Sequence, residues 1–248
     1  MAVLVTRPHP DCETTAEALR ARGFEVLLAP MLRFEQLAFP DDAEVVYGAV
    51  IATSANALRA IEQQLAASRL LKLPLFAVGE HTASVARKAG FSKVIAAQGD
   101  AAGLRDLVLE SVRVRALKKA SVLLYLAGAD LSRDLAGELG ERGFSVVTQT
   151  TYRMTPVSSL PVAACDAFAA NAVEAVLHYS RRSARAFLDA VRADGVEISA
   201  LAIPHCCISP AVATILRDAG ANQVMVAASP DEKALFEALA RALRSGLA

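Results

Sequence analysis

The segments "AEALRARGFEVLLAPMLRF" (residues 16–34) and "AGELGERGFSVVTQTTYRM" (residues 136–154) are two versions of one pattern within a single chain. In both, a helical stretch ends at a glycine and an apolar run follows. Gly23 aligns with Gly143 and Arg33 aligns with Arg153, and the members of each pair are 120 residues apart. A helix, a glycine and a buried strand that return together predict a repeated α/β unit.

The repeat continues downstream. The stretch "VIATSANALRAI" (50–61) resembles "VLHYSRRSARAF" (176–187), and "AVGEHTASVARKAGFSKVIAA" (77–97) resembles "CISPAVATILRDAGANQVMVAA" (207–228). The spacing between copies drifts from 120 to 130 residues, as loop insertions would cause. The chain therefore reads as a tandem duplication of a unit of about 125 residues, which is near the usual size of a domain.

Each copy alternates short apolar runs with amphipathic helical stretches. Unbroken Val, Ile and Leu runs are typical of parallel strands that are buried on both faces. We predict an α/β protein of two flavodoxin-like domains, each a parallel sheet flanked by helices. The expected strands lie at 2–6, 25–29, 46–52, 74–78, 93–96, 121–126, 144–149, 173–179, 203–208 and 223–227.

Two longer extended segments, at equivalent places in the copies, are not followed by a helix. We interpret 34–40 and 150–156 as linker strands between two domains. Domain 1 then comprises 1–33 with 157–248, and domain 2 comprises 41–149. Two crossing linkers predict a hinge with a cleft beneath it.

Composition excludes several classes of protein. The 248 residues carry 26 Lys and Arg against 26 Asp and Glu, so a nucleic-acid or membrane-surface protein is not expected. A hydrophobic fraction of 54% excludes general disorder. We expect no leader peptide and, because no uncharged apolar run is long enough, no membrane span, and we expect a cytoplasmic monomer.

The cysteines give no sign of a metal site. Cys12, Cys165, Cys206 and Cys207 form no CxxC pair, and we see no histidine at metal-ligand spacing. We interpret them as small buried thiols. The chain has no dinucleotide fingerprint, P-loop or catalytic-triad spacing, so we expect no cofactor and no metal.

Small polar residues follow several strands, just where a helix should begin. Such positions expose backbone N–H groups that suit an anion, although the same residues are also ordinary helix caps. They are Thr6-Arg7, Thr53 to Asn56, Gly79 to Thr82, Gly128 to Asp130, Ser180 to Ser183 and Ser209-Pro210. The cationic candidates are Arg7, Arg133, Arg153, Arg181 and Arg182, with solvated surface charge as the alternative.

Histidine and tyrosine add a few candidates. His205 lies within an apolar strand and is expected in the core, whereas His9 and His81 lie near strand ends and could face a cleft. Tyr152 is one of only four tyrosines and falls in the second linker. With no nucleophile or metal motif, the residues favour chemistry by positioning and electrostatics.

In their order and spacing, these motifs resemble the uroporphyrinogen-III synthase family over nearly the whole chain. The matching stretches are "VTRP" (5–8), "ALRARGFEVLLAPMLRFE" (18–35), "IATSANAL" (51–58), "FAVGEHTASVARKAGF" (76–91), "YLAGADLSRDLAGELGERGF" (125–144), "TTYRM" (150–154), "HYSRRSARAF" (178–187) and "SPAVATILRDAG" (209–220). The resemblance implies two α/β domains joined by a two-stranded linker.

It also implies an activity. The substrate would be hydroxymethylbilane, a polycarboxylate linear tetrapyrrole, with possible transient hand-over from hydroxymethylbilane synthase. A hydro-lyase reaction expels water to give an azafulvene. A spiro-pyrrolenine then forms, and its reclosure inverts ring D to yield uroporphyrinogen III for tetrapyrrole biosynthesis. The resemblance implies no cofactor or metal.

Residue roles are carried over from the matching motifs. Tyr152 would assist departure of the hydroxyl, as an acid or, since a phenol is weakly acidic at neutral pH, as a hydrogen-bond donor. The family's substrate-binding positions fall on Thr53, Ser54, Thr82, Arg133 and Ser180, and we add Arg7, Gly128, Ser183 and Ser209 from their places after strands. One departure is Ala211-Val212, where many relatives have a threonine-rich helix start.

Two other functions remain open at this point. A hinged two-domain receptor for a small anion would share the architecture, and a non-catalytic tetrapyrrole-binding homologue would share the motifs. Either would bind the bilane without changing the ratio of product isomers, so catalysis distinguishes them from a synthase.

Overall fold

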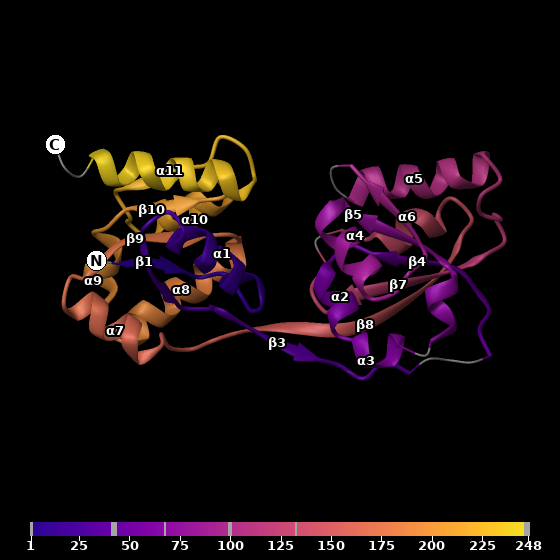
Figure 1. Cartoon of the computed structure of the whole chain (residues 1–248), viewed down its shortest axis with the longest axis horizontal. Helices are drawn as coiled ribbons and strands as arrows, with labels where there is room; N and C mark the ends of the chain where they lie inside the picture. The colour runs from indigo at the N-terminus through magenta and orange to yellow at the C-terminus, as the bar shows by residue number, and fades with distance from the viewer. Residues whose placement is uncertain (1, 41–43, 67, 99–100, 132, 246–248) are drawn as a thin grey trace. The chain divides into compact units, whose positions relative to one another are not determined.

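Two sheets organise the chain in the computed structural model, which describes residues 2–40, 44–66, 68–98, 101–131 and 133–245 (Figure 1). Contacts between residues divide the chain into two compact units. Unit 1 comprises residues 1–34 and 155–248, and unit 2 comprises residues 35–154.

Unit 1 is built on a parallel sheet in the order β11-β10-β9-β1-β2. In this register Leu4 lies between Leu27 and Val176. The strands are β1 (Ala2–Val5), β2 (Glu25–Leu28), β9 (Val173–His178), β10 (His205–Cys207) and β11 (Val224–Val226). The helices are α1 (Asp11–Arg20), α7 (Val162–Ala169), α8 (Arg181–Ala193), α9 (Glu197–Leu201), α10 (Pro210–Asp218) and α11 (Glu232–Ser245).

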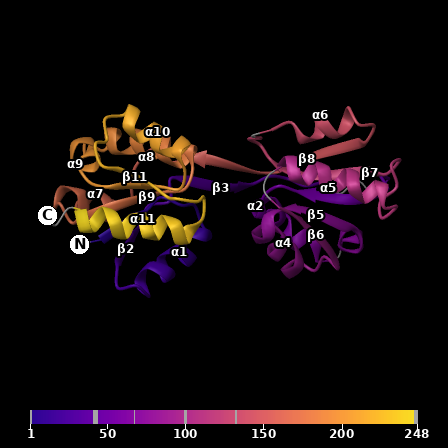
Figure 2. The same ribbon diagram turned by 90° about the horizontal axis from the view of Figure 1, so that it is seen from above.

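Helices cover both faces of this sheet, as Figure 2 shows. On one face Val3, Val5 and Leu177 pack with Leu19 of α1 and Leu235 of α11. Because side chains alternate along a strand, the residues between these point to the opposite face, which carries α8 and α10. All four residues of β1 are buried, which explains why the run is wholly apolar.

The second face contains a buried histidine pair. His178 Nε2 lies 3.0 Å from His205 Nδ1, and His205 Nε2 lies 3.0 Å from the carbonyl oxygen of Ala200. The rings of Phe187 and His178 pack in a T-shaped arrangement. Burial lowers the pKa of His205 to about 4 and the pKa of His178 well below its ordinary value. The prediction that His205 belongs to the core is therefore confirmed.

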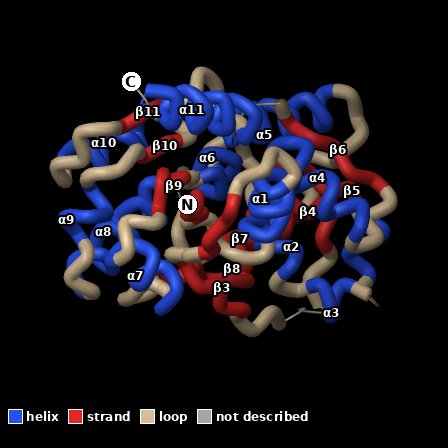
Figure 3. The backbone as a smooth tube through the Cα atoms, turned by 60° about the vertical axis from the view of Figure 1, so that its left-hand side comes forward, coloured by secondary structure: helices blue, strands red, loops and turns tan. Residues whose placement is uncertain are grey.

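Unit 2 is built on the sheet β3-β8-β7-β4-β5-β6, in which residues 32–34 of β3 and 155–156 of β8 belong to unit 1. Its strands are β3 (Leu32–Gln36), β4 (Tyr47–Ala52), β5 (Pro74–Val78), β6 (Lys93–Ala97), β7 (Val122–Gly128) and β8 (Ser145–Pro156). The helices are α2 (Ala55–Arg59), α3 (Glu62–Leu65), η1 (Arg69–Lys72, a 3-10 helix), α4 (Gly79–Lys88), α5 (Ala101–Arg113) and α6 (Leu135–Gly140). The core beneath α5 and α6 includes Ile51, Phe76 and Leu123. Figure 3 shows strands between helices in each unit.

The two sheets share one strand order, as the internal repeat predicts. The order β6-β5-β4-β7-β8 corresponds to β11-β10-β9-β1-β2. Within these five shared positions, each sheet takes two strands from one copy of the repeat and three from the other, and β3 is an additional strand of the unit 2 sheet. Each unit therefore combines strands from both copies of the repeat, and neither copy forms a unit by itself.

The two extended segments differ from their predicted bounds. The expected strand at 144–149 and the expected linker at 150–156 are one continuous strand, β8. The other segment is shorter than the predicted 34–40, because β3 ends at Gln36. The backbone N–H of Leu37 donates to the carbonyl of Thr151, and that of Val157 donates to Met31. Residues 41–43, at the predicted start of domain 2, lie outside the described residues.

A search of the described helices for a membrane span found none that is long and apolar enough to cross a bilayer.

Candidate functional site

A pocket of about 360 Å³ lies in unit 2, where the ends of β4 and β7 meet. In this sheet β5 and β6 extend to one side of the β4–β7 pair, and β8 and β3 extend to the other. Ligands of parallel α/β sheets bind at such a switch in strand order, beyond the carboxyl ends of the strands. The lining residues are Thr53, Ser54, Val78, Ala101, Tyr125, Gly128, Asp130, Leu131, Arg133 and Tyr152.

The pocket brings together half of the residues predicted as site residues from the sequence. These are Thr53, Ser54, Gly128, Arg133 and Tyr152. They come from the ends of β4 and β7, from within β8 and from the loop that follows β7.

A β-bulge sets the direction of Tyr152. The ladder between β7 and β8 pairs Ala127 with Thr150 but Gly128 with Tyr152, so Thr151 is the extra residue. Thr151 is buried, and its Oγ1 donates to the carbonyl oxygens of Ala57 at 3.1 Å and Ala127 at 3.3 Å. These contacts anchor the bulge in unit 2.

The end of β7 is shaped to receive the Tyr152 ring. A Cβ atom placed on Gly128 would lie 2.7 Å from Tyr152 Cζ and 2.8 Å from its hydroxyl oxygen. The backbone N–H of Ala129 donates to the carbonyl of Tyr152 at 2.9 Å. Glycine at this position therefore allows the ring to lie against the strand.

A second tyrosine, which the sequence does not single out, supports the pocket wall. The hydroxyl of Tyr125 lies 3.0 Å from Thr53 Oγ1, and the side chain is buried. Burial raises the pKa of Tyr125, and the neighbouring Tyr152 contributes to the increase. The sequence feature that points to Tyr125 is its position as a polar aromatic residue inside the apolar run "VLLYLAG" of β7.

Arg133 brings a cation to the pocket as part of a small network. Its Nε and Nη2 donate to the two carboxylate oxygens of Glu138, the latter at 2.9 Å, and Arg105 Nη1 donates to the same carboxylate at 3.1 Å. Hydrogen bonds from Arg133 and Arg105 lower the pKa of Glu138. The carboxylate of Asp134 caps α6 by accepting from the backbone N–H of Gly137. Glu138 and Arg105 were not predicted from the sequence.

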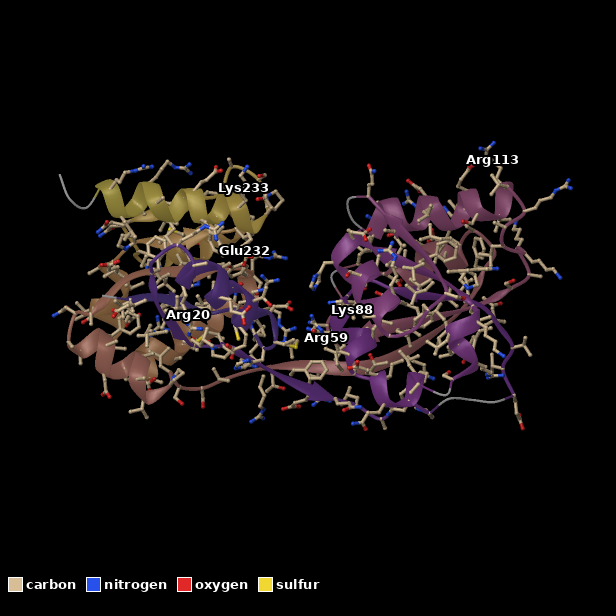
Figure 4. All side chains as sticks on the ribbon, in the orientation of Figure 1. Arg20, Arg59, Lys88, Arg113, Glu232 and Lys233 are labelled. Carbon is tan, nitrogen blue, oxygen red and sulfur yellow. The ribbon has the colours of Figure 1, made fainter. Side chains whose placement is uncertain are left out.

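Thr82 is placed differently from these residues. It lies on α4, is 5% exposed, and is not among the residues that line the pocket. Ser54 lines the pocket and is also a helix cap, because its Oγ accepts from the backbone N–H of Asn56. A smaller cavity of about 230 Å³ in unit 2 is lined by Leu58, Arg59, Glu62, Val85, Lys88 and Ala89, of which Figure 4 labels Arg59 and Lys88.

The other predicted site residues belong to unit 1. Arg7 follows β1, and Ser180 follows the adjacent β9, so both lie at the corresponding switch in strand order. Ser180 caps α8: its Oγ accepts from the backbone N–H of Ser183 at 3.0 Å and lies 3.0 Å from the buried Ser183 Oγ. Ser209 occupies the cap position of α10 without a side-chain cap bond.

Three other candidates are placed like ordinary core or surface residues. Val212, the departure from the family pattern, is 2% exposed and contributes to the core beneath α10. Arg153 and Arg181 are exposed, as expected of solvated charges.

The start of α1 brings together a group of potential metal ligands that is not predicted from the sequence. Among the described residues, His9, Cys12 and Glu13 place one ligand atom each within 4.8 Å of one another. His9 Nδ1 lies 3.1 Å from Cys12 Sγ and 3.6 Å from Glu13 Oε1. The expectation of no histidine at metal-ligand spacing is therefore wrong for His9. Burial raises the pKa of Cys12 to about 11, which keeps the thiol protonated at neutral pH and disfavours it as a ligand.

A family model and solved structures of known proteins match this chain. The family model described as uroporphyrinogen-III synthase HemD matches residues 13–237. No curated protein sequence gave a match. The structure is similar to uroporphyrinogen-III synthetase from Helicobacter pylori 26695, with a TM-score of 0.64 and 20% identity over 98% of this chain and 99% of that one.

A second similar structure is a mutant uroporphyrinogen III synthase from the extremely thermophilic bacterium Thermus thermophilus, with a TM-score of 0.57 and 18% identity over 99% of this chain and 100% of that one. At these identities the likeness is one of fold, and it confirms the predicted α/β class. The family model spans most of the chain, and this protein therefore belongs to the uroporphyrinogen-III synthase family.

Proposed function

We propose that this chain cyclises hydroxymethylbilane to uroporphyrinogen III with loss of water. Membership of the family makes it an enzyme of tetrapyrrole biosynthesis. The observation that carries the finer assignment is the unit 2 pocket, which combines a tyrosine hydroxyl, small hydroxyl side chains and an arginine.

Tyr152 is the proposed catalytic residue. Its phenol donates a hydrogen bond to the substrate hydroxyl as the C–O bond breaks. The departing hydroxide takes up a proton and leaves as water, and loss of the pyrrole N–H proton gives the azafulvene. Gly128 and the bulge at Thr151 support this role because they fix where the ring lies. Preorganised donors of this kind are effective because they need no reorganisation when charge develops.

The remaining polar groups are proposed to bind substrate carboxylates. Arg133 suits a carboxylate, and Thr53 and Ser54 bring hydroxyls to the same pocket. Thr82, Ser180, Ser183, Ser209 and Arg7 are retained as proposed substrate contacts.

The chemical problem is one of orientation. The unguided bilane also closes, to the symmetric isomer, so the enzyme has to hold a flexible chain in the geometry that leads to the spiro-pyrrolenine and inverts ring D. Holding reacting atoms in place supplies a large part of many rate enhancements. A site of small donors fits that task.

Several finer assignments accompany this proposal. We propose a hydro-lyase that needs no cofactor or metal and works as a cytoplasmic monomer, with transient hand-over from hydroxymethylbilane synthase. We propose domains of 1–33 with 157–248 and of 41–149, joined by linkers at 34–40 and 150–156 that contain the carboxyl-terminal ends of strands β3 and β8.

A coupled assay tests the function. Hydroxymethylbilane is generated enzymatically, the purified protein is added, and the oxidised products are separated into isomers I and III. Dominant isomer III is expected. Isomer I alone, from folded protein, would refute the proposal and favour a tetrapyrrole- or anion-binding protein.

The role of Tyr152 is tested by Tyr152→Phe, which should lower kcat by about 10²-fold or more. Tyr47→Phe is the matched control, because Tyr47 lies on β4 and does not line the pocket. Wild-type turnover in Tyr152→Phe would remove this residue from the mechanism.

A further inference from the structure

The carboxylate of Glu232, on the first turn of α11 (Figure 4), accepts three hydrogen bonds on one oxygen. Oε1 lies 2.6 Å from Thr15 Oγ1, 3.1 Å from the Tyr179 hydroxyl and 3.3 Å from Arg7 Nη1. The Arg7 guanidinium also lies over the Tyr179 ring, 4.9 Å from its centroid. These donors converge on one point and together form a receptor for a carboxylate.

In unit 1 this receptor lies at the switch in strand order, the place where ligands of parallel α/β sheets bind. Arg7 follows β1 and Tyr179 follows β9, and these two strands form the switch in strand order of the sheet. In unit 2 the equivalent switch, between β7 and β4, holds the 360 Å³ pocket. The same place in the two units is thus a pocket in one and a carboxylate receptor in the other.

The internal repeat shows what differs between them. Ala101-Ala102-Gly103-Leu104 at the start of α5 aligns with Glu232-Lys233-Ala234-Leu235 at the start of α11. Ala101 lines the unit 2 pocket, whereas its counterpart Glu232 extends a carboxylate into the receptor. Glu232 is therefore a side chain that the other copy of the site lacks.

The charges around Arg7 favour a ligand carboxylate that replaces Glu232 over one that binds beside it. Arg7 Nη2 also donates to Asp11 Oδ2 at 3.3 Å, so two carboxylates already share one guanidinium. A third carboxylate beside them would be repelled. The side chains of Arg7 and Glu232 are 26% and 32% exposed, so an incoming carboxylate can reach them.

We propose that Arg7, Thr15 and Tyr179 form a carboxylate-binding site in unit 1, that Glu232 occupies it in the free enzyme, and that a carboxylate of the tetrapyrrole displaces Glu232. This inference rests on the proposed function for the identity of the ligand. Glu232 is then an internal competitor that weakens substrate binding.

Glu232→Ala tests the exchange, with Glu237→Ala as the matched control. Glu237 is exposed on the same helix, so both variants lose one negative charge from α11. We expect Glu232→Ala to lower KM for hydroxymethylbilane about fivefold with little change in kcat, and Glu237→Ala to leave KM unchanged. Adding Arg7→Gln to Glu232→Ala should cancel the gain. An unchanged or raised KM in folded Glu232→Ala would overturn the proposal and make Glu232 a structural brace.

Two further measurements keep the test decisive. Glu232→Gln preserves side-chain shape and should lower KM in the same direction if the alanine variant fails to fold. Fluorescence titration with uroporphyrin, a polycarboxylate tetrapyrrole, measures binding without turnover. Tighter binding by Glu232→Ala than by wild type would support the site even if the coupled assay gave no isomer III, whereas equal binding would refute it.

Discussion

The ring of Tyr152 lies in the space that a side chain on residue 128 would need, 2.7 Å from the Cβ position of Gly128. Gly128→Ala should therefore move the ring, lower kcat by more than about tenfold and destabilise unit 2 by about 1–3 kcal/mol. Steady-state kinetics and chemical denaturation measure the two effects. Gly140→Ala is the control, since a Cβ on Gly140 meets no atom within 4 Å. Full activity in Gly128→Ala would show that the ring position is unimportant.

The bulge at Thr151 gives a second prediction. Thr151→Val keeps the shape of the side chain but removes the donor to Ala57 and Ala127, which should cost about 1–2 kcal/mol of unfolding free energy. Looser placement of Tyr152 should also reduce kcat. Thr148→Val, at an exposed position of the same strand, should change neither quantity. Equal stability of the two variants would contradict the anchoring role.

The buried pair His178 and His205 makes stability depend on pH. Both pKa values are lower in the folded state than the ordinary value near 6.5, so the unfolded chain binds more protons as the pH falls. The unfolding free energy should be fully present above pH 6.5 and should decline towards pH 4, near the pKa of His205. Urea unfolding across this range measures the decline.

A double variant, His178→Leu with His205→Leu, identifies the source of this pH dependence. It also removes His178 Nδ1, a buried nitrogen that has no hydrogen-bond partner within the described ranges. Its stability should vary less between about pH 4 and 6.5 than that of the wild type. His81→Gln, at an exposed site, should keep the wild-type dependence. An unaltered slope in the double variant would exclude the pair as its cause.

The four free cysteines should differ in their reaction with a thiol reagent. Burial raises the pKa values of Cys12, Cys206 and Cys207 to about 11, 12 and 12, and all three are fully buried. Cys165 is only half-buried, although burial and Asp194 raise its pKa too. At about pH 8 we expect one thiol to react quickly with Ellman's reagent and four to react after unfolding. Cys165→Ser should abolish the fast phase, and a fast phase that persists would place the reactive thiol elsewhere.

The sequence predicts the sheets well because apolar runs of this kind need burial on both faces. All ten expected strands are present, and their order follows the repeat. The bounds of the two extended segments are predicted less well, because pairing between β3 and β8 decides where they end. No local pattern in the sequence marks the continuity of β8 through residue 150.

The site is only partly visible in the sequence. Hydroxyls, glycine and arginine at strand ends can be read from their positions, and five predicted residues meet in the unit 2 pocket. The roles of Tyr125 and Glu138 cannot be read in this way. Tyr125 depends on a partner that is far away in the sequence, and Glu138 depends on one that lies across a loop. The receptor around Glu232 joins residues more than two hundred positions apart, which only the folded chain brings together.

The exchange of strands between the copies also fixes an order of assembly during synthesis. Residues 35–154 are continuous, so unit 2 can fold once residue 154 has left the ribosome. The interior strand β1 of the unit 1 sheet is made first, yet its neighbour β9 begins only at Val173. At about 5–20 residues per second, the N-terminal segment waits many seconds with an apolar edge uncovered. It is therefore the part of the nascent chain with most need of protection by a chaperone.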